Sequence, residues 1–347
     1  ERILDLIEAP FVDLGFETER IPGRGLSGGH LVARPRGLRP GAATQLLLGH
    51  CDTVWPVGTI EDMPFSCSDG RARGPGVFDM KGGIVQLLGA LELLTRDGVE
   101  WSCAPVVLIN SDEEKGSSES RPHIVRLARQ AYRAFVLEPA LGIDGHLKTR
   151  RKGVGRFDIR ILGRSAHAGL DPGSGASAIL ALSRIVERLN ELNDLSRGIT
   201  VNVGRIDGGT TSNVVAESAQ MTVDVRVPSR AAAAATEARI RSMRPSVPGT
   251  AIEISGGFGR PPLEKNERNQ RLWKRVRSEA GRIGIDLDEG MAGGGSDGST
   301  TSLFTATLDG LGPVGDGAHA AHEFLFVEKL AERTELLAHL LLMPPDE

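Results

Sequence analysis

The sequence predicts an α/β protein with a mostly parallel, doubly wound sheet and an inserted two-layer α+β domain. In the N-terminal part of the chain, continuous apolar runs of strand length alternate with helical patterns. Such runs are typical of parallel strands that are covered on both faces. Near residue 153 the pattern changes to strands that alternate apolar and polar residues. The 347 residues also exceed what one core usually needs, so two domains are expected.

The elements of the first domain follow one another in order. Residues 1–15 have apolar residues at helical spacing, and a Pro/Gly loop joins the next two segments, which have strand character. The pattern predicts strands at 28–37, 44–50, 104–114 and 132–139, and helices at 80–98 and 121–130. Gly98 marks the end of the long helix. Strands that alternate with helices in this way form βαβ units.

The second domain is an insertion in the first. Its order is strand, helix, strand, strand, helix, strand, at 153–163, 174–193, 198–209, 220–228, 231–245 and 250–257. The alternating strands predict an antiparallel sheet with one solvated face. A helical period returns at 269–284, and the final stretch again has α/β character. We therefore expect one discontinuous domain, 1–152 with 263–347, and an inserted domain, 153–262.

Composition and charge exclude several classes of function. The net charge is −4, which provides no field for binding nucleic acid or anionic lipid. No apolar stretch approaches the roughly 20 residues of a membrane span, so no membrane association is expected. Three cysteines without a CxxC spacing favour a reducing compartment. No signal peptide is visible, so we expect a cytoplasmic protein. A periplasmic or secreted location stays open, because the sequence begins without Met.

Polar side chains follow several of the predicted strands and Gly-rich turns. They lie in five short stretches: "LLLGHCD" with His50 and Asp52, "RGPGVFD" with Asp79, "VVLINSDEE" with Glu113 and Glu114, "AFVLE" with Glu138, and "GPVGDGAHAAHEF" with His319. Ligands of open parallel sheets collect at the carboxyl ends of the strands. Four of the five stretches would deliver their side chains to this edge of the sheet.

The chemistry of such a cluster is restricted. Carboxylates crowded in a crevice repel one another unless they bind protons or cations. Two His and three carboxylates, one of them shared, suit two zinc ions, and a free Glu beside a ligand Glu suits a general base. Each motif alone has an ordinary explanation: a turn for HxD, a solvated surface for the Glu pair, and an N-cap for Asp79. The joint occurrence in this order supports the metal site.

At these residues the sequence resembles the co-catalytic zinc amidohydrolases, the family of glutamate carboxypeptidase, acetylornithine deacetylase, succinyl-diaminopimelate desuccinylase and aminoacylase. The resemblance rests on "GHCDTVWP", "RGPGVFDMKGG", "NSDEEKGSSESR", "LEP", "GRSAHAGLDPGSGASAI", "SNVVAESAQMTVDVRVP" and "GGGSDG". These stretches run across nearly the whole chain in the family's order. The "RGPGVFDMKGG" and "GRSAHAG" forms are most similar to the glutamate carboxypeptidase branch.

The resemblance implies a role for each residue of the cluster. One zinc ion would be held by His50, Asp79 and Glu138, and the other by Asp79, Glu114 and His319, so that Asp79 bridges the two. Glu113 would be the general base and acid, and Asp52 would accept the second ring N–H of His50. The resemblance also implies a cis peptide after Asp79. His322 is the alternative to His319. The family has its ligand a few residues before a Glu that an apolar stretch follows, and Glu323 gives this spacing for His319.

The inserted domain is implied to pair with its copy in a homodimer. His167 of "GRSAHAG" would then reach into the partner's site and stabilise the oxyanion, with Asn213 of "TSNVV" beside it. Arg226 and Arg260 are candidates for binding a substrate carboxylate, and Gly294 of "AGGGSDGST" would present backbone N–H groups. The ordinary alternatives are a surface histidine for His167, a solvated side chain for Arg226 and a flexible loop around Gly294.

We therefore expect a metal-dependent hydrolase that cleaves an amide bond adjacent to a free carboxylate, a carboxypeptidase of the glutamate carboxypeptidase type. The expected substrate is a small N-acyl amino acid, a dipeptide or a folate-like molecule. Two divalent ions are expected, zinc first, with cobalt or manganese as alternatives. The first alternative function is an N-acyl amino acid deacylase with the same metal site. The second is a non-catalytic binding protein, which retention of all the ligands and of Glu113 disfavours.

Overall fold

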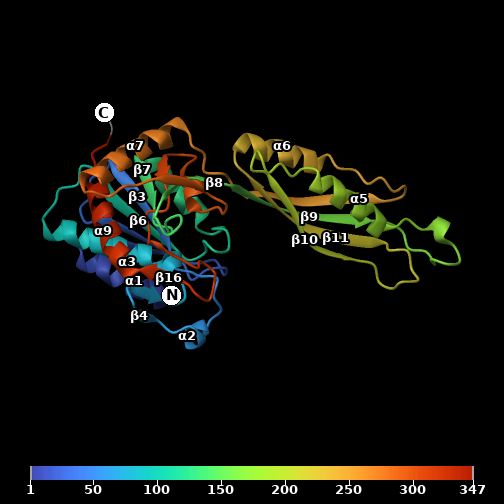
Figure 1. The fold of residues 1–347 in the computed structure, drawn as a ribbon, viewed down its shortest axis with the longest axis horizontal. Coiled ribbons are helices and arrows are strands. Elements are labelled where there is room, and N and C mark those ends of the chain that lie inside the picture. Colours follow the sequence, from blue (N-terminus) through green and yellow to red (C-terminus); the bar gives the residue numbers. More distant parts are fainter. Residues whose placement is uncertain (1, 346–347) are drawn as a thin grey trace. The chain divides into compact units, whose positions relative to one another are not determined.

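A six-stranded sheet forms the centre of the first of two units in the computed structural model, which describes residues 2–345 (Figure 1). Unit 1 contains the chain up to Arg150, Glu264–Ala292 and the residues from Ser296 onward. Unit 2 contains Arg151–Leu263 together with the short segment Gly293–Gly295. The second unit is therefore an insertion, and three glycines of a later loop belong to it as well.

The central sheet is mostly parallel. Its strand order is β1-β2-β6-β3-β7-β14. These strands are β1 (Phe16–Ile21), β2 (His30–Pro35), β3 (Thr44–His50), β6 (Ala104–Asn110), β7 (Arg133–Val136) and β14 (Ala306–Leu308). Strands β6, β3, β7 and β14 are parallel, whereas β2 is antiparallel to β6 and β1 is antiparallel to β2. The predicted fold class is thus confirmed. Strand β1 was not predicted, because its alternating "FETERI" follows the first helix directly.

Helices cover both faces of this sheet. They are α1 (Arg2–Asp13), α3 (Gly82–Arg96), α4 (Arg121–Gln130), α7 (Glu267–Arg282), α8 (Asp297–Thr301) and α9 (Val327–Leu342). The short helix α2 (Thr59–Asp62) has no buried residue and lies on a loop away from the sheet. Leu47 of β3 packs in a core with α1, α3, α7 and α9, the first, second and last of which lie together in Figure 1. Leu46 and Leu48 pack on the opposite face with α4. Because both faces of β3 are buried, an uninterrupted apolar run is required there.

Two small sheets extend unit 1. One has the order β15-β16-β5-β4 and the other pairs β13 with β8. Their strands are β4 (Ser66–Ser68), β5 (Arg71–Arg73), β8 (Leu147–Arg151), β13 (Glu289–Ala292), β15 (Gly315–Asp316) and β16 (Phe324–Phe326). Phe324 pairs with Arg73, and the Arg71 guanidinium lies 4.5 Å from the Phe324 ring centre. This sheet joins the segment before Asp79 to the segment after His319.

Unit 2 is a four-stranded antiparallel sheet with two helices on one face. The strand order is β10-β11-β9-β12. The elements are β9 (Gly153–Leu162), η2 (Pro172–Ser174), α5 (Ala178–Asn190), β10 (Thr200–Gly208), β11 (Ser218–Val227), α6 (Arg230–Arg241) and β12 (Ala251–Arg260). Phe157, Ile159 and Ile161 of β9 are buried in a core with α5 and α6, while the residues between them face solvent. The alternation read from the sequence therefore marks the packed face.

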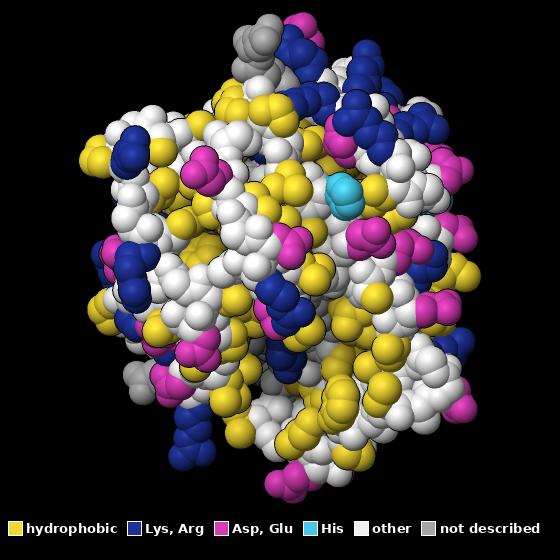
Figure 2. Space-filling model, turned by 90° about the vertical axis from the view of Figure 1, so that its left-hand side faces the viewer, with side chains coloured by type: hydrophobic (Ala, Val, Ile, Leu, Met, Phe, Trp, Pro, Cys, Tyr) yellow, Lys and Arg dark blue, Asp and Glu magenta, His cyan; other side chains and the backbone are white. Residues whose placement is uncertain are grey.

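The surface carries charges of both signs. Figure 2 shows Lys and Arg side chains interspersed with Asp and Glu on one face of the molecule. Among the described residues, no helix combines the length and the apolar character that crossing a membrane requires.

Candidate metal centre

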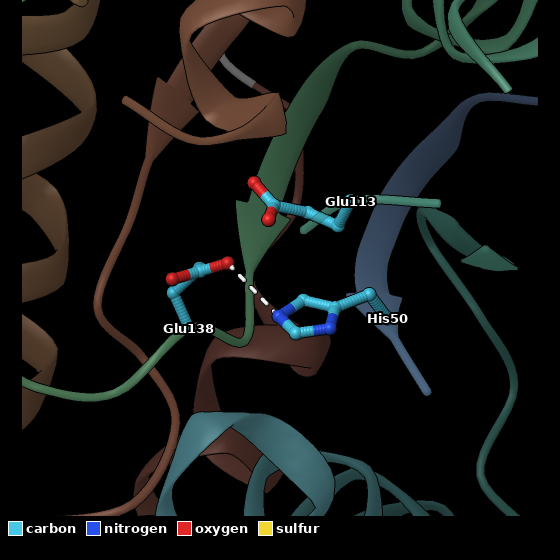
Figure 3. Close-up of side chains that lie close together, drawn as sticks. All are labelled: His50, Glu113 and Glu138. Carbon is cyan, nitrogen blue, oxygen red and sulfur yellow. Dashed lines mark ion pairs between the residues drawn. The ribbon is translucent and has the colours of Figure 1, made fainter. Parts of the chain in front are cut away.

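Three parallel strands deliver polar residues to one edge of the central sheet. His50 is the last residue of β3, Glu113 and Glu114 follow β6, and Glu138 follows β7. In register, His50 lies beside Asn110 at the end of β6. Figure 3 shows the side chains of His50, Glu113 and Glu138 pointing toward one another. The Nε2 atom of His50 lies 3.4 Å from Oε1 of Glu138.

Asp79 reaches this edge from an irregular helical turn, η1 (Val77–Lys81), which precedes α3. The chain enters the turn through Gly76, which has a φ of +72° and whose hydrogen faces Thr53 and Lys81; a Cβ would lie 2.5 Å from the Thr53 side chain. The peptide bond between Asp79 and Met80 is cis, as the resemblance implies. Glycine is therefore required at position 76, where the turn that carries the central carboxylate begins.

Asp79 lies between two histidines. Its Oδ1 is 3.2 Å from Nε2 of His50, and its Oδ2 is 3.3 Å from Nε2 of His319. His319 also lies 3.3 Å from Oε2 of Glu114. His319 occupies the turn between β15 and β16 with a φ of +62°, a conformation that residues other than glycine rarely adopt. The alternative ligand, His322, is exposed, and no contact joins it to the described carboxylates of the cluster.

The charges of the cluster shift one another's pKa values. Burial opposes charging of His50, but its contacts with Asp52, Asp79 and Glu138 raise the pKa of the imidazole well above its usual range. Burial and the neighbouring Asp79 raise the pKa of Glu114 to about 7. The hydrogen bond to Asp79 raises the pKa of His319 to about 9. Without cations, the carboxylates are thus balanced by protons on the histidines and on Glu114.

The donor set fits divalent cations. Ligand atoms of His50, Glu113 and Glu138 lie within 4.8 Å of one another, and so do those of His50, Asp79 and Glu114. Oε1 of Glu114 is buried and has no hydrogen-bond partner, although buried polar atoms normally have one. Imidazole nitrogen and carboxylate oxygen are the ligands that zinc and related ions accept. The cluster can therefore hold cations in place of the protons.

Asp52 acts mainly on the loop that carries the two glutamates. Its Oδ2 accepts the main-chain N–H of Glu114 at 3.0 Å, and its Oδ1 accepts that of Glu113 at 3.3 Å. The ring Nδ1 of His50 lies 3.0 Å from the main-chain oxygen of Asp52 and 3.5 Å from its Oδ1. The carbonyl is thus the nearer acceptor for the second ring nitrogen, and the carboxylate, which the resemblance implies for this contact, lies slightly farther away.

Three buried carboxylates that support the site were not assigned this role from the sequence. Oδ2 of Asp112 accepts the N–H groups of Glu119 and Ser120, which closes the loop after Glu114. Asp297 accepts hydrogen bonds from Asn110 and Ser117, and Glu323 accepts four N–H groups. Asp112 stands beside Glu113 in "SDEE", and Asp297 lies in "GGGSDG". An acidic residue within a few positions of a predicted site residue was the available signal.

In unit 2, the ring of His167 has a defined orientation. Its Nδ1 accepts the main-chain N–H groups of Gly169 and Leu170, both at 3.1 Å. In the neutral ring the proton therefore lies on Nε2, which is a donor. Asn213 lies next to this loop, because its main-chain oxygen accepts the N–H of Ala168 at 2.9 Å.

The other predicted substrate residues of unit 2 differ in their surroundings. The guanidinium of Arg226 donates two hydrogen bonds to the carboxylate of Asp224, from Nε to Oδ1 at 2.8 Å and from Nη2 to Oδ2 at 3.0 Å. This pair fills the guanidinium fork and does not favour a substrate role for Arg226. The main-chain oxygen of Gly294 accepts a hydrogen bond from Nη1 of Arg151 at 3.2 Å. Gly295 packs against the side chain of Arg260, so Arg260 and the Gly294 loop are adjacent.

The chain belongs to a known family of peptidases. The model of the peptidase family M20/M25/M40 matches residues 46–343. Carboxypeptidase G2 from Pseudomonas sp. (strain RS-16) is 29% identical over 97% of this chain and 82% of its own length. Acetylornithine deacetylase from Myxococcus xanthus is 29% identical over 65% of this chain and 61% of its own.

A solved structure has the same fold. The YXEP protein of Bacillus subtilis, a dinuclear metal-binding peptidase of the M20 family, superposes with a TM-score of 0.69 at 16% identity. This match covers 97% of this chain and 90% of that one. The protein is therefore a metal-dependent hydrolase of peptide or amide bonds.

Proposed function

We propose that the protein hydrolyses an amide or peptide bond next to a free carboxylate, as a carboxypeptidase with two divalent ions. The observation that carries this proposal is the position of Asp79 between His50 and His319, with Glu138 and Glu114 beside the two histidines. Similarity to carboxypeptidase G2 over nearly the whole chain supports the carboxypeptidase activity. The implied substrates are dipeptides, N-acyl amino acids and folate-like molecules.

The residues would divide the metal centre between them. His50, Asp79 and Glu138 would hold one ion, and Asp79, Glu114 and His319 the other. When bound, the two ions supply Lewis acidity toward water and toward the carbonyl of the scissile bond. Zinc is proposed because histidine and carboxylates are its usual ligands, with cobalt or manganese as alternatives. Elemental analysis of protein purified without added metal tests this identity.

Glu113 is proposed as the proton carrier. Its side chain is largely buried, and the carboxylate points toward the space beside His50 and Glu138 (Figure 3). The bonds from its own N–H and from Glu114 to Asp52 hold its main chain in place. Glu113 would take a proton from the attacking water and give it to the leaving amine.

Unit 2 is proposed to complete the site in a homodimer. His167 of a second subunit would donate Nε2–H to the oxyanion of the tetrahedral intermediate, with Asn213 beside it. Arg260 would bind the substrate carboxylate, and the Gly294 loop next to it would donate backbone N–H groups. Strand β10 is at the edge of its sheet, and Ile206 on this strand is exposed; an open edge can pair with a second copy. Sedimentation analysis tests the dimer.

A second candidate function is an N-acyl amino acid deacylase, which the similarity to acetylornithine deacetylase favours. The metal centre would be the same, and the substrate pocket would differ. A panel of N-acyl-glutamates, other N-acyl amino acids and dipeptides, assayed with metal-loaded protein, separates the two. Preference for a C-terminal glutamate supports the carboxypeptidase, and preference for acetylated amino acids supports the deacylase. If the metal-loaded wild-type protein cleaves no member, the proposed substrate class is wrong. Glu113→Ala is the control, because cleavage that persists in it does not come from this site.

A further inference from the structure

Glu323 is a buried carboxylate that none of the proposed steps uses. It lies at the end of the turn that carries His319, directly before β16, and 1% of its surface is exposed. Its Oε2 accepts the indole N–H of Trp55 at 3.1 Å and the main-chain N–H of Gly76 at 2.8 Å. Its Oε1 accepts the main-chain N–H groups of Phe78 at 2.9 Å and Asp79 at 3.0 Å. Each oxygen of the carboxylate thus accepts two hydrogen bonds.

These bonds connect the two sides of the contact between Asp79 and His319. Glu323 follows His319 by four residues, and the turn between them is closed by the hydrogen bond from the N–H of Glu323 to the oxygen of Ala320, at 3.0 Å. On the other side, the carboxylate binds the main chain of Asp79 itself. A single buried side chain therefore fixes the main chain of the bridging carboxylate relative to that of the histidine it faces.

The arrangement requires a carboxylate. All four partners are N–H donors, and only a carboxylate presents acceptors at both of its ends. An amide in its place would turn its NH₂ group toward two donors and lose at least two hydrogen bonds. The ammonium of Lys81 lies near enough to interact favourably with this charge. Buried N–H groups without an acceptor are costly, so the turn before Asp79 would rearrange.

We propose that Glu323 is a positioning residue of the metal centre, which sets the placement of Asp79 opposite His319 through the N–H groups of Gly76, Phe78 and Asp79. This proposal rests on the proposed function, because the ions are those of the peptidase site. The oxygens of Glu323 accept four N–H groups and are therefore not proposed as ligands of an ion or a substrate. The effect of Glu323 is on the geometry of two ligands, and thus on the affinity for the ion they share.

The test compares metal affinity and stability in matched variants. Glu323→Gln removes the charge at constant shape, Glu323→Asp withdraws the carboxylate by one methylene, and Trp55→Phe removes one donor but keeps the three main-chain bonds. Each full-length protein is stripped of metal, its thermal unfolding is measured, and Zn²⁺ and Co²⁺ are titrated by calorimetry. The visible spectrum of the Co²⁺ form reports the ligand geometry. We expect Glu323→Gln to lose roughly 10–100-fold in affinity for one ion, as changes behind metal ligands usually do.

The expected pattern also includes a smaller loss in Glu323→Asp, near wild-type affinity in Trp55→Phe, and an altered Co²⁺ spectrum only in the Glu323 variants. Wild-type affinity in folded Glu323→Gln overturns the proposal, even if the variant unfolds at a lower temperature. Failure of both Glu323 variants to fold without metal also overturns it, in favour of a purely structural role. If wild-type protein does not bind two ions, the proposed function fails instead, and the two failures are thus distinguished.

Discussion

Asp79 and His319 face each other at 3.3 Å between Oδ2 and Nε2, while the other oxygen of Asp79 faces His50 at 3.2 Å. One carboxylate thus contributes an oxygen to each half of the proposed centre. Hydrogen bonds to the two histidines hold the pKa of Asp79 well below its usual range, although burial opposes this shift. The carboxylate is therefore charged and ready to bind cations across the physiological pH range.

Replacing Asp79 is expected to weaken both metal sites together. In Asp79→Asn, one end of the side chain carries an NH₂ group, which is not a metal ligand. We expect the affinity for both ions to fall, for at least one of them by more than the roughly 10–100-fold that is typical of residues behind the ligands, and activity to fall as well. Calorimetric titration and elemental analysis measure both stoichiometries. Two ions bound with wild-type affinity would contradict the bridging role.

Removing the carboxylate of Glu113 should separate metal binding from catalysis. In Glu113→Ala the proposed ligands all remain, so both ions should still bind. Loss of a general base typically lowers the rate by about 10²–10⁴-fold, and we expect kcat to fall by that amount with little change in KM. Metal content and steady-state kinetics are measured on the same preparation. Because Glu113 also lies in a group with His50 and Glu138, loss of one ion would identify it as a ligand.

The parallel strands and most of the cluster could be predicted from the sequence. Strands β3 and β6 are buried on both faces, so their apolar runs and the polar residues that end them are visible without a structure. The small sheet of β15, β16, β5 and β4 was not predicted, because its strands are only two or three residues long. Such strands carry no measurable period.

The contacts behind the ligands depend on tertiary structure and were harder to predict. The Asp52 carbonyl lies nearer to Nδ1 of His50 than the Asp52 carboxylate does, at 3.0 Å against 3.5 Å, and a main-chain atom leaves no sequence signal. In the sequence, the position of Glu323 supports the choice of His319 as the ligand. The hydrogen bonds of Glu323 to Gly76 and Asp79, however, depend on the packing of two distant segments.

The ion pair of Arg226 was also missed, because the sequence suggested a guanidinium available for a substrate. Asp224 is two residues away on the same strand face, however, and fills its fork.

The protonation of the cluster predicts how the stability of the metal-free protein depends on pH. The pKa of His319 is raised from 6.5 to about 9, and that of Glu114 from 4.5 to about 7. A raised pKa stabilises the fold below the ordinary value and loses this contribution as pH rises through the shifted value. The contribution of these two groups to the stability of the metal-free protein should therefore fall from pH 5 to 9, because both lose their protons in that interval. Burial lowers the pKa values of His30 and His123, so these two groups oppose the loss only in the acidic part of the interval.

Thermal unfolding of chelator-treated protein at several pH values measures this loss. We expect the Tm to fall across the interval, and His319→Asn to remove mainly the part between neutral pH and 9. Since ligands bind metal in their deprotonated forms, metal uptake at pH 7 should release protons. Calorimetry in two buffers of different ionisation enthalpy counts them. A Tm that rises over this range, or uptake without proton release, would be inconsistent with the protonated cluster.

The orientation of the His167 ring predicts that its Nε2–H group is the donor to the oxyanion. Because Nδ1 accepts the N–H groups of Gly169 and Leu170, nitrogen NMR of the metal-free protein should show the Nε2–H tautomer. His167→Ala should lower kcat by about 10²–10³-fold, the usual effect of removing an oxyanion donor, without loss of metal. An unchanged rate would leave His167 as a surface histidine.

Whether this histidine acts across a dimer can be decided by mixing two inactive variants. A heterodimer of His167→Ala and Glu113→Ala subunits has one site with both residues intact if His167 reaches into the partner, and none if it serves its own chain. After complete subunit exchange at equal concentrations, half of the dimers are mixed, so about a quarter of wild-type activity should return for a two-fold symmetric dimer. Mixtures that stay inactive, although sedimentation shows exchange, would place His167 in its own subunit's site or in no site.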